Sequence, residues 1–350
     1  MIALLGGCGE TPPAAEKGTP DDRQAELRAA RRRAFWHPRD LDTALTLGQI
    51  SYDLKAYNDA YAAYRRAAAL DPESLAACLG MARTSAMLHD PGEALDWIRR
   101  AERLAPGDPD LIDLKGRMLL LAGRLDDAVE VLQRATRLSP QSVSIHLNLA
   151  SAYATLGRHQ EAVRQAQAAG RLAPNDSTTQ LALAMYLDKA GEPEAAEQAY
   201  RRALKLEPGN HAAMLALAQN LVDRKRGLGE ARRLAQAAAK SEAQRPAAAL
   251  TAAWALHLQG QTEKAAGELG KFLSGSPHHP GAWRKLVTMI RALRDSARAR
   301  GDESAAEMLE ERARQAERDS RQFIGLAEPL PAVLSPIAAE NQRQDHGDLP

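Results

Sequence analysis

The chain has 350 residues, of which 46 are Lys or Arg and 45 are Asp or Glu, so its formal net charge is only +1. This balance provides no basic surface for the phosphates of nucleic acid, and we expect no nucleic-acid partner. Apolar residues make up 45% of the chain and aromatic residues 4%, with almost no clusters of β-branched residues. The composition therefore predicts helices throughout and argues against an α/β enzyme.

The cysteines and the hydropathy argue against two further classes of protein. Cys8 and Cys78 lie far apart in regions of different character, so they predict neither a disulfide framework nor a thiolate metal site. No apolar run approaches the roughly 18 residues that a membrane-spanning helix needs. We therefore expect a soluble body whose attachment to a membrane, if any, comes only from a lipid anchor.

Residues 1–20 hold the one targeting signal. Leu5, Gly6, Gly7 and Cys8 resemble the lipobox of bacterial lipoproteins, and a polar tether with several prolines follows. Only seven residues precede Cys8 and none of them is basic, so a usual signal would need an upstream start codon. The resemblance implies that Cys8 is lipidated and, with Gly9 next in line, that the protein is an outer-membrane lipoprotein facing the periplasm. The alternative is a cytoplasmic protein in which Cys8 is an ordinary exposed residue.

Residues 21–40 predict a single capping helix. Its periodic part runs from Asp22 to about Trp36 and closes at Pro38, which lacks the backbone donor that a helix needs to continue. The short basic run of Arg31 to Arg33 within it, like a second run at Arg224 to Arg226, is interpreted as a solvated face.

Evenly spaced prolines organise the chain that follows. Six of them are 34 residues apart: Pro38, Pro72, Pro106, Pro140, Pro174 and Pro208. Three series of small residues keep the same period. They are Ala60, Ala94, Ala128, Ala162 and Ala196; Ala67, Ala101, Ala135, Ala169 and Ala203; and Gly48, Ala82, Gly116, Ala150, Ala184 and Ala218. Self-similarity at a fixed period of this length is typical of a solenoid.

Each period predicts two short antiparallel helices. Gly123, Gly157 and Gly191 lie where the turn between them is expected, because glycine adopts the left-handed conformation that ends a helix at little cost. A small residue at the crossing point lets the two helix backbones approach closely. One such unit cannot cover its own apolar face, so neighbouring units must stack.

These residues resemble the motif of the tetratricopeptide repeat family. The resemblance implies an all-α fold, a right-handed superhelical solenoid of about seven helix pairs over residues 41–279 with terminal capping helices. Trp283 then opens a longer helical hairpin over residues 280–321, whose charged second helix suits a terminal cap. The proline-containing segment 322–350 predicts a disordered tail.

No catalytic, cofactor or metal motif is recognisable. The stretch from Gly267 to Lys271 lacks the glycine spacing of a phosphate-binding loop, and Phe272 stands where such a loop has Ser or Thr. His278 and His279 are adjacent, whereas two metal ligands on one helix face would be three or four residues apart. We expect a non-enzymatic protein without a cofactor.

The family resemblance also implies a concave groove lined by the first helix of each unit. Carried onto this sequence, the inward places give a candidate partner-binding set: Leu45, Gln49, Tyr52, Leu79, Arg83, Asp110, Asp113, Arg117, Leu120, Leu147, Ser151, Trp254 and His257. Arg83 and Arg117, one repeat apart among leucines, suit a protein or peptide segment with apolar anchors and acidic groups. Two alternatives stay open: the leucines pack on neighbouring helices, or Trp254 and His257 form the binding site.

Two functions remain open on this basis. The first is a lipid-anchored scaffold that aids assembly of a secretion, pilus or other envelope complex. The second is a soluble regulatory module that acts on a separate enzyme or complex. A partner of heat-shock chaperones is not expected, because Leu45 and Gln49 occupy the places of the Lys and Asn that resemblance to chaperone-binding repeats would require.

Overall fold

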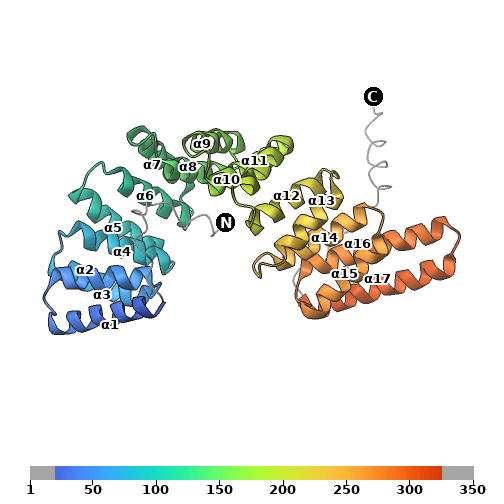
Figure 1. The fold of residues 1–350 in the computed structure, drawn as a ribbon, viewed down its shortest axis with the longest axis horizontal. Coiled ribbons are helices and arrows are strands. Elements are labelled where there is room, and N and C mark those ends of the chain that lie inside the picture. Colours follow the sequence, from blue (N-terminus) through green and yellow to red (C-terminus); the bar gives the residue numbers. More distant parts are fainter. Residues whose placement is uncertain (1–19, 325–350) are drawn as a thin grey trace, which may run out of the picture. The chain divides into compact units, whose positions relative to one another are not determined.

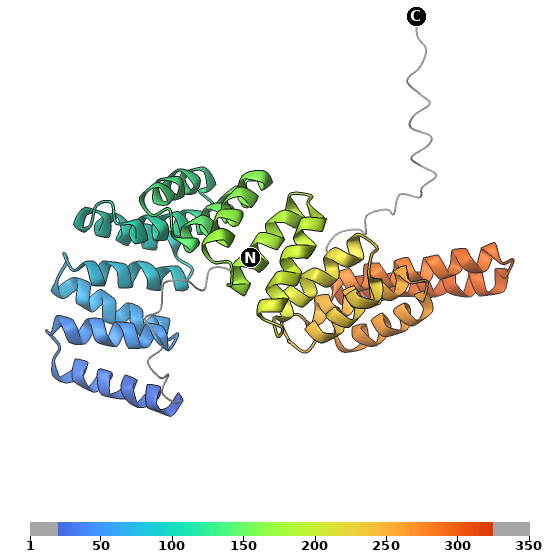
Figure 2. The same ribbon diagram turned by 45° about the horizontal axis from the view of Figure 1, so that its top comes forward.

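A computed structural model describes residues 20–324, and 17 helices account for nearly all of that range. The helices fall into two compact units, one ending at Leu206 and the other beginning at Glu207. Within each unit the helices stack as antiparallel pairs (Figures 1 and 2). The predicted all-helical solenoid is thus confirmed. Cys8, the tether and the predicted tail beyond residue 324 lie outside the described residues.

The first unit consists of one single helix and five helix pairs. The single helix is α1 (Pro20–Trp36), and the pairs are α2 (Leu41–Asp53) with α3 (Tyr57–Leu70), α4 (Leu75–Met87) with α5 (Pro91–Leu104), α6 (Pro109–Leu121) with α7 (Leu125–Leu138), α8 (Val143–Thr155) with α9 (His159–Leu172), and α10 (Ser177–Lys189) with α11 (Pro193–Leu206). In every pair the first helix has 13 residues and the second has 14. The rest of each period forms two short turns.

The second unit contains three pairs of less regular length. They are α12 (His211–Asp223) with α13 (Leu228–Ala238), α14 (Arg245–Leu258) with α15 (Thr262–Gly275), and α16 (Pro280–Ala299) with α17 (Glu303–Ile324). The last two helices have 20 and 22 residues, so the final hairpin is longer than any other pair in the described range. α17 continues three residues beyond the end that the sequence analysis gave it.

The first helix of most pairs begins shortly after one of the evenly spaced prolines, at a polar capping residue. Two residues after the proline stands a polar residue whose side chain accepts a hydrogen bond from a backbone N–H of the helix, as Asp40 does from Thr43 and Asp176 from Thr179. Ser74, Asp108 and Asn210 cap their helices in the same way. Each cap satisfies a donor that the first turn would leave unpaired.

The turn inside each pair requires a left-handed residue. Gly123, Gly157 and Gly191 have φ of 72°, 75° and 78° there, as predicted. In the pairs before and after them, the same place holds Lys55, His89 and Lys225 with φ of 60°, 64° and 52°. The stacked helices therefore impose the turn even where the residue disfavours it.

Small residues make the helix crossings possible. All ten alanines of the two alanine series are fully buried, at 0% exposure. The Tyr64 ring lies against two glycines, so that a Cβ atom would come within 2.8 Å of it at Gly48 and 2.3 Å at Gly80. At Gly116 a Cβ atom would lie 2.4 Å from the Leu132 side chain. These places accept no larger residue without movement of the neighbouring helix.

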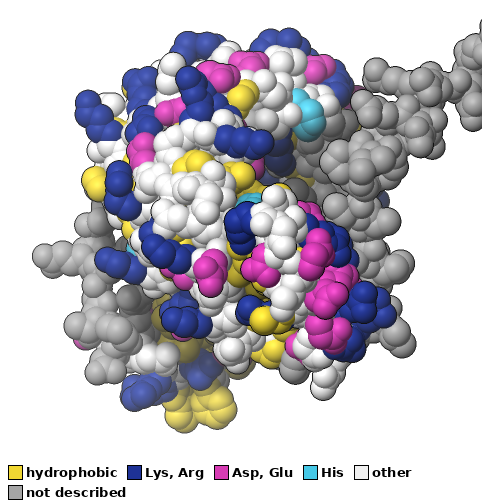
Figure 3. Space-filling model, turned by 90° about the vertical axis from the view of Figure 1, so that its right-hand side faces the viewer, with side chains coloured by type: hydrophobic (Ala, Val, Ile, Leu, Met, Phe, Trp, Pro, Cys, Tyr) yellow, Lys and Arg dark blue, Asp and Glu magenta, His cyan; other side chains and the backbone are white. Residues whose placement is uncertain are grey.

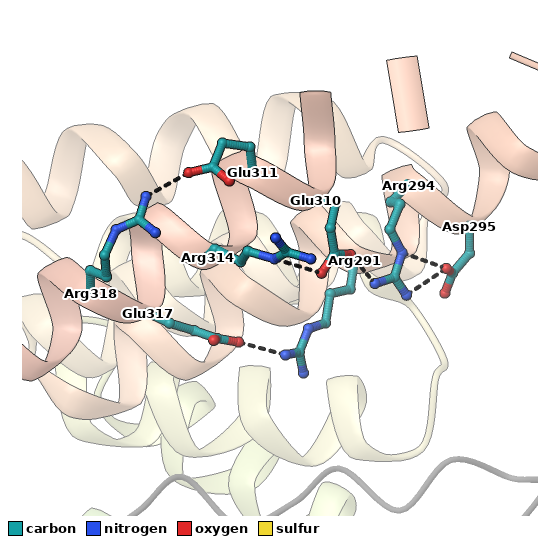
Figure 4. A network of polar contacts seen from close by, with 8 residues as sticks. All are labelled: Arg291, Arg294, Asp295, Glu310, Glu311, Arg314, Glu317 and Arg318. Atoms are coloured by element: carbon teal, nitrogen blue, oxygen red, sulfur yellow. Dashed lines mark hydrogen bonds and ion pairs between the residues drawn. The ribbon is translucent and has the colours of Figure 1, made fainter. Parts of the chain in front are cut away.

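Ion pairs join the two helices of the final hairpin (Figure 4). Arg294 of α16 bonds both Asp295 and Glu310, and Arg291 bonds Glu317 of α17. The hydrogen bond from Arg294 lowers the pKa of the Glu310 carboxyl. On the side of the molecule drawn in Figure 3, basic and acidic side chains are interspersed rather than segregated. This arrangement suits a hairpin that ends a stack in water.

Gly116→Ala tests the close crossing against a matched control. The new methyl group should clash with Leu132 and destabilise the protein by about 1 to 3 kcal/mol, although alanine is the better helix former. Gly170→Ala, in α9, meets only ordinary contacts at 3.6 Å and should stabilise the helix by about 0.5 to 1 kcal/mol. Urea unfolding followed by circular dichroism measures both. Equal effects of the two changes would contradict the account of the crossings.

Candidate functional site

Polar side chains from the first helices of the first unit lie near one another. Tyr52 comes from α2, Arg83 from α4, Asp113 and Arg117 from α6, and Asn148 from α8. Burial raises the pKa of Tyr52, and the positive charges of Arg83 and Arg117 both oppose this shift. Asn148 donates a hydrogen bond of 2.7 Å to Asp113. We call these five residues the polar stripe. Four of them belong to the predicted groove, and the structure brings those four together.

Asp113 is a buried carboxyl in this stripe, with 8% of its surface exposed. Burial raises its pKa, while the Asn148 hydrogen bond and the positive charge of Arg117 oppose the shift. The side chain therefore lies within the wall of the first-helix surface and not on its exposed face. A carboxyl that is kept at a buried position with a perturbed pKa is more common at functional sites than elsewhere.

The two arginines of the stripe offer unused hydrogen-bond donors. Arg83 is exposed and makes no hydrogen bond or ion pair with the residues that the structure describes. Arg117 is half-buried, and its Nε atom is buried without an acceptor in the same range of residues. A buried donor without a partner costs free energy, so an incoming acceptor would find this side chain already partly desolvated.

Two tyrosines lie at or beside the stripe. Tyr52, within it, is half-buried, its ring centroid lies 5.6 Å from that of Tyr57, and burial raises its pKa. Tyr186 on α10 is buried; burial raises its pKa, and a hydrogen bond with Ser151 on α8 opposes the shift. The hydrogen bond with Ser151 thus joins α10 to α8, the helix that carries Asn148.

The leucines of the predicted groove contribute to the core. Leu45 is half-buried and packs against the buried clusters of Ala44 and Tyr64, and Leu79 packs against the cluster of Cys78 and Ile98. These contacts favour the alternative in which the leucines pack on neighbouring helices. Leu120 and Leu147 are also half-buried.

Of the remaining predicted residues of the first unit, Ser151 is half-buried, and Gln49 and Asp110 are exposed. Gln49 donates a hydrogen bond to Asp53 at 2.9 Å and accepts one from the Tyr64 hydroxyl at 3.2 Å, so its amide is already engaged. Asp110 lies in the first turn of α6, where its backbone N–H is capped by Asp108. Its own carboxylate is exposed.

Trp254 and His257 belong to a separate cluster in the second unit. Their ring centroids are 4.8 Å apart, and Lys285 of α16 lies over the Trp254 ring with its Nζ atom 4.1 Å from the centroid. Burial and the charge of Lys285 lower the pKa of His257, and burial lowers the pKa of Lys285. Since Trp254 also packs against the core of the unit, the cluster is largely self-contained.

Sequence reasoning missed Asn148, Tyr186 and Lys285. Asn148 and Tyr186 occupy helix places outside the four that the family resemblance assigns to the groove. Asn148 carried a usable signal, because it is the one amide side chain among the apolar and small residues of α8. Lys285 could be found only once α16 was known to pack on α14.

Two negative findings concern the described range. Among residues 20–324, no group of three or more His, Cys, Asp or Glu side chains could hold a metal ion. The helices of the same range include none that is long and apolar enough to cross a membrane.

Comparison with known proteins identifies the repeat. Sequence models described as tetratricopeptide repeat match residues 51–118, 114–177 and 177–220. No curated protein sequence matches the chain.

Among solved structures similar to this chain, one shows the same fold with a TM-score above 0.5. The APC/C hetero-tetramer Cut9–Hcn1 is similar over 67% of this chain with a TM-score of 0.56 and 20% identity, and the match spans only 46% of that protein. PilF of Pseudomonas aeruginosa is 19% identical over 61% of this chain and 91% of its own, with a TM-score of 0.48. YrrB, described as a repeat protein with an unusual peptide-binding site, is 20% identical over 54% of this chain and 98% of its own, with a TM-score of 0.42.

Asp113→Asn should raise the stability of the protein at neutral pH. Because burial raises the pKa of Asp113 above its ordinary value of 3.8, the folded chain holds this proton more tightly than the unfolded chain. Stability then falls as pH rises from 3.8 through the folded pKa, and the cost persists above it. Asparagine keeps the acceptor for Asn148 without the charge. The urea midpoint as a function of pH measures the effect.

Asp110→Asn, on the exposed side of the same helix, is the matched control. It should change stability by no more than about 0.5 kcal/mol. An Asp113→Asn protein less stable than wild type at pH 7 would show that the buried carboxylate stabilises the fold.

Proposed function

This chain is a tetratricopeptide repeat protein, and we propose that it is a non-enzymatic scaffold that binds a segment of a partner protein along the polar stripe. Repeat proteins of this kind use extended surfaces made by successive units for binding. The observation that carries the proposal is the arginine pair, since Arg83 and the Nε atom of Arg117 have no acceptor among the described residues. The fold itself does not use these donors.

The chemistry of the stripe favours a segment that carries carboxylates. A guanidinium binds a carboxylate through two parallel hydrogen bonds, and a partly desolvated pair of this kind contributes about 1.5 to 3 kcal/mol. Asp113 lies one helical turn from Arg117, whose positive charge opposes the rise in the pKa of Asp113 that burial causes. Tyr52 and Tyr57 provide apolar rings beside the charge, where a side chain flanking the carboxylate would pack.

A lipid anchor would place this scaffold in the cell envelope. The support for it is the lipobox-like stretch that ends at Cys8, followed by a polar tether. With an acylated Cys8 the protein would be an outer-membrane lipoprotein whose repeats face the periplasm. There it would aid assembly of a secretion, pilus or other envelope complex.

Peptide selection tests the polar stripe. Peptides selected from a random peptide library on the wild-type protein should be enriched in Asp and Glu. Their affinity should fall at least tenfold for Arg83→Glu/Arg117→Glu, because each lost carboxylate pair contributes about 1.5 kcal/mol or more. Calorimetric titration of the selected peptides measures the loss, and circular dichroism checks that the variant is folded at the temperature of the titration.

Arg99→Glu/Arg103→Glu is the matched control, since it makes the same charge change on exposed places of the second helix α5. These peptides should bind it as they bind wild type. If the control loses as much affinity, the effect is one of net charge. If Trp254→Ala abolishes binding and the Arg83 and Arg117 changes do not, the site is the cluster of the second unit.

Membrane fractionation tests the lipid anchor. Expressed from its full natural start in a Gram-negative bacterium, wild type should stay with the outer membrane through a high-salt wash, which removes proteins held only by charge. Cys8→Ser should be released by that wash. A wild-type protein found in the soluble fraction would contradict the anchor and leave the scaffold proposal standing.

A further inference from the structure

The end of α1 carries the two most exposed aromatic residues of the described range. Phe35 is 75% exposed and Trp36 is 70% exposed, with ring centroids 5.4 Å apart in an edge-to-face arrangement. The opposite face of α1 is buried, through Leu27, Ala30 and Ala34. The aromatic pair therefore adds nothing to the packing of this helix.

The repeat period shows that the fold does not require aromatic residues at the places of Phe35 and Trp36. Counting in steps of 34, the place of Phe35 holds Ala69 in the first repeat and a basic residue in the next four, namely Arg103, Arg137, Arg171 and Lys205. The place of Trp36 holds a leucine in all five repeats; Leu172 is half-buried, and Leu70, Leu104, Leu138 and Leu206 are 37% to 48% exposed. A solvent-exposed aromatic residue thus stands where four of these five repeats have a basic residue and none has an aromatic one.

Unpaired arginines surround the aromatic pair. Arg31 forms an ion pair with Asp59, but Arg32, Arg33 and Arg39 are exposed and have no partner among the residues that the structure describes. The acidic residues of α1 all lie in its first half. The charge of the helix is therefore segregated toward the aromatic end.

Arg66 of α3 holds this end of α1 in place. It donates hydrogen bonds to the carbonyl oxygen of Ala34 at 3.2 Å and to that of Pro38 at 2.9 Å. The helical hydrogen bonding continues to His37, whose N–H bonds the Arg33 carbonyl at 2.8 Å, and the turn that follows is closed by a bond of 3.2 Å from Asp40 N–H to the His37 carbonyl. The exposed rings thus stand on a fixed support and not on a frayed end.

We propose that Arg32, Arg33, Phe35, Trp36 and Arg39, the α1 patch, bind the surface of an anionic lipid bilayer. Protruding aromatic rings insert at the level of the headgroups, and arginines beside them are attracted by anionic lipids. A bilayer yields around protruding side chains, whereas a protein partner would have to supply a matching pocket. The charge of the patch is complementary to that of such a membrane.

Membrane binding by the α1 patch goes beyond the proposed scaffold function. It rests on the proposed lipid anchor only in that the tether must be long enough to let the patch reach the membrane. Residues 9–19 span up to about 38 Å when extended, while α1, with 17 residues, is about 25 Å long. The tether is therefore long enough for the far end of α1 to touch the bilayer that would hold Cys8. One lipid chain anchors a protein only weakly, and a basic patch is a known kind of second signal.

Vesicle binding of the unacylated full-length Cys8→Ser protein tests the patch. It should sediment with phosphatidylglycerol vesicles at low salt, bind phosphatidylcholine vesicles at least tenfold more weakly, and lose the phosphatidylglycerol binding at high salt. Adding Phe35→Ser/Trp36→Ser should weaken binding at least tenfold, and so should Arg32→Glu/Arg33→Glu. Phe35→Arg, which introduces the basic residue type that four other repeats have at this place, should also weaken it, although it adds positive charge.

Two double variants at the equivalent places of other repeats are the matched controls: Leu104→Ser/Leu138→Ser and Arg103→Glu/Arg137→Glu. Both should bind phosphatidylglycerol vesicles as the parent protein does. On addition of phosphatidylglycerol vesicles, the difference in fluorescence between the parent and its Trp36→Phe variant should shift to the blue. The proposal is overturned if the patch variants bind vesicles like the parent, or if Trp36 shows no shift. It is also overturned if Phe35→Ser/Trp36→Ser abolishes only self-association in sedimentation equilibrium. Since no lipid is attached to this protein, failure here leaves the anchor at Cys8 to be judged by fractionation alone.

Discussion

The close crossing of two short helices over a small residue is the constraint on which the rest of this structure depends. Thirteen- and fourteen-residue helices are marginal alone, so each pair gains its stability by packing. The packing is tight because alanines such as Ala60 and Ala67 are fully buried. It needs a glycine where a large partner intrudes, as at Gly48 and Gly80 beside Tyr64. Because every pair needs such a crossing, small residues recur in the sequence with the period of the repeat. The same crossing allows neighbouring pairs to stack.

Because the crossings use small residues, the larger polar side chains remain for other roles. Arg83 and Arg117 project from first helices whose cores are already filled, and Asp113 is a buried carboxyl whose pKa is raised by burial. At the free end of the first unit, Phe35 and Trp36 lie outside the packing in the same sense. In both places, the side chains that lower the stability of the fold, or add nothing to it, are the ones that would contact a binding partner.

The sequence was sufficient for the fold and insufficient for the site. Prolines, alanines and glycines at a period of 34 predicted the helix pairs and the left-handed turns, because each acts through local backbone chemistry. The left-handed Lys55 and His89 were missed, since stacking and not residue preference fixes them. The division after Leu206 lies beside Pro208, where the even proline series ends, but a change in proline spacing does not by itself mark a boundary between units. The bond between Asn148 and Asp113, the core contacts of Leu45 and the unpaired Nε of Arg117 depend on packing between repeats, which no single repeat encodes.

Native-state hydrogen exchange along the chain tests most directly the claim that each pair is stabilised by its neighbours. If it is, amides should be protected in steps: within the first unit, α6 to α9 should exchange last, and α1 and α2 should exchange earlier with a lower opening free energy. In the second unit, α17, the last helix of the stack, should exchange before α14 and α15. One common opening free energy for the amides of all helices would contradict this account, because it would mean that the repeats unfold as a single globular core.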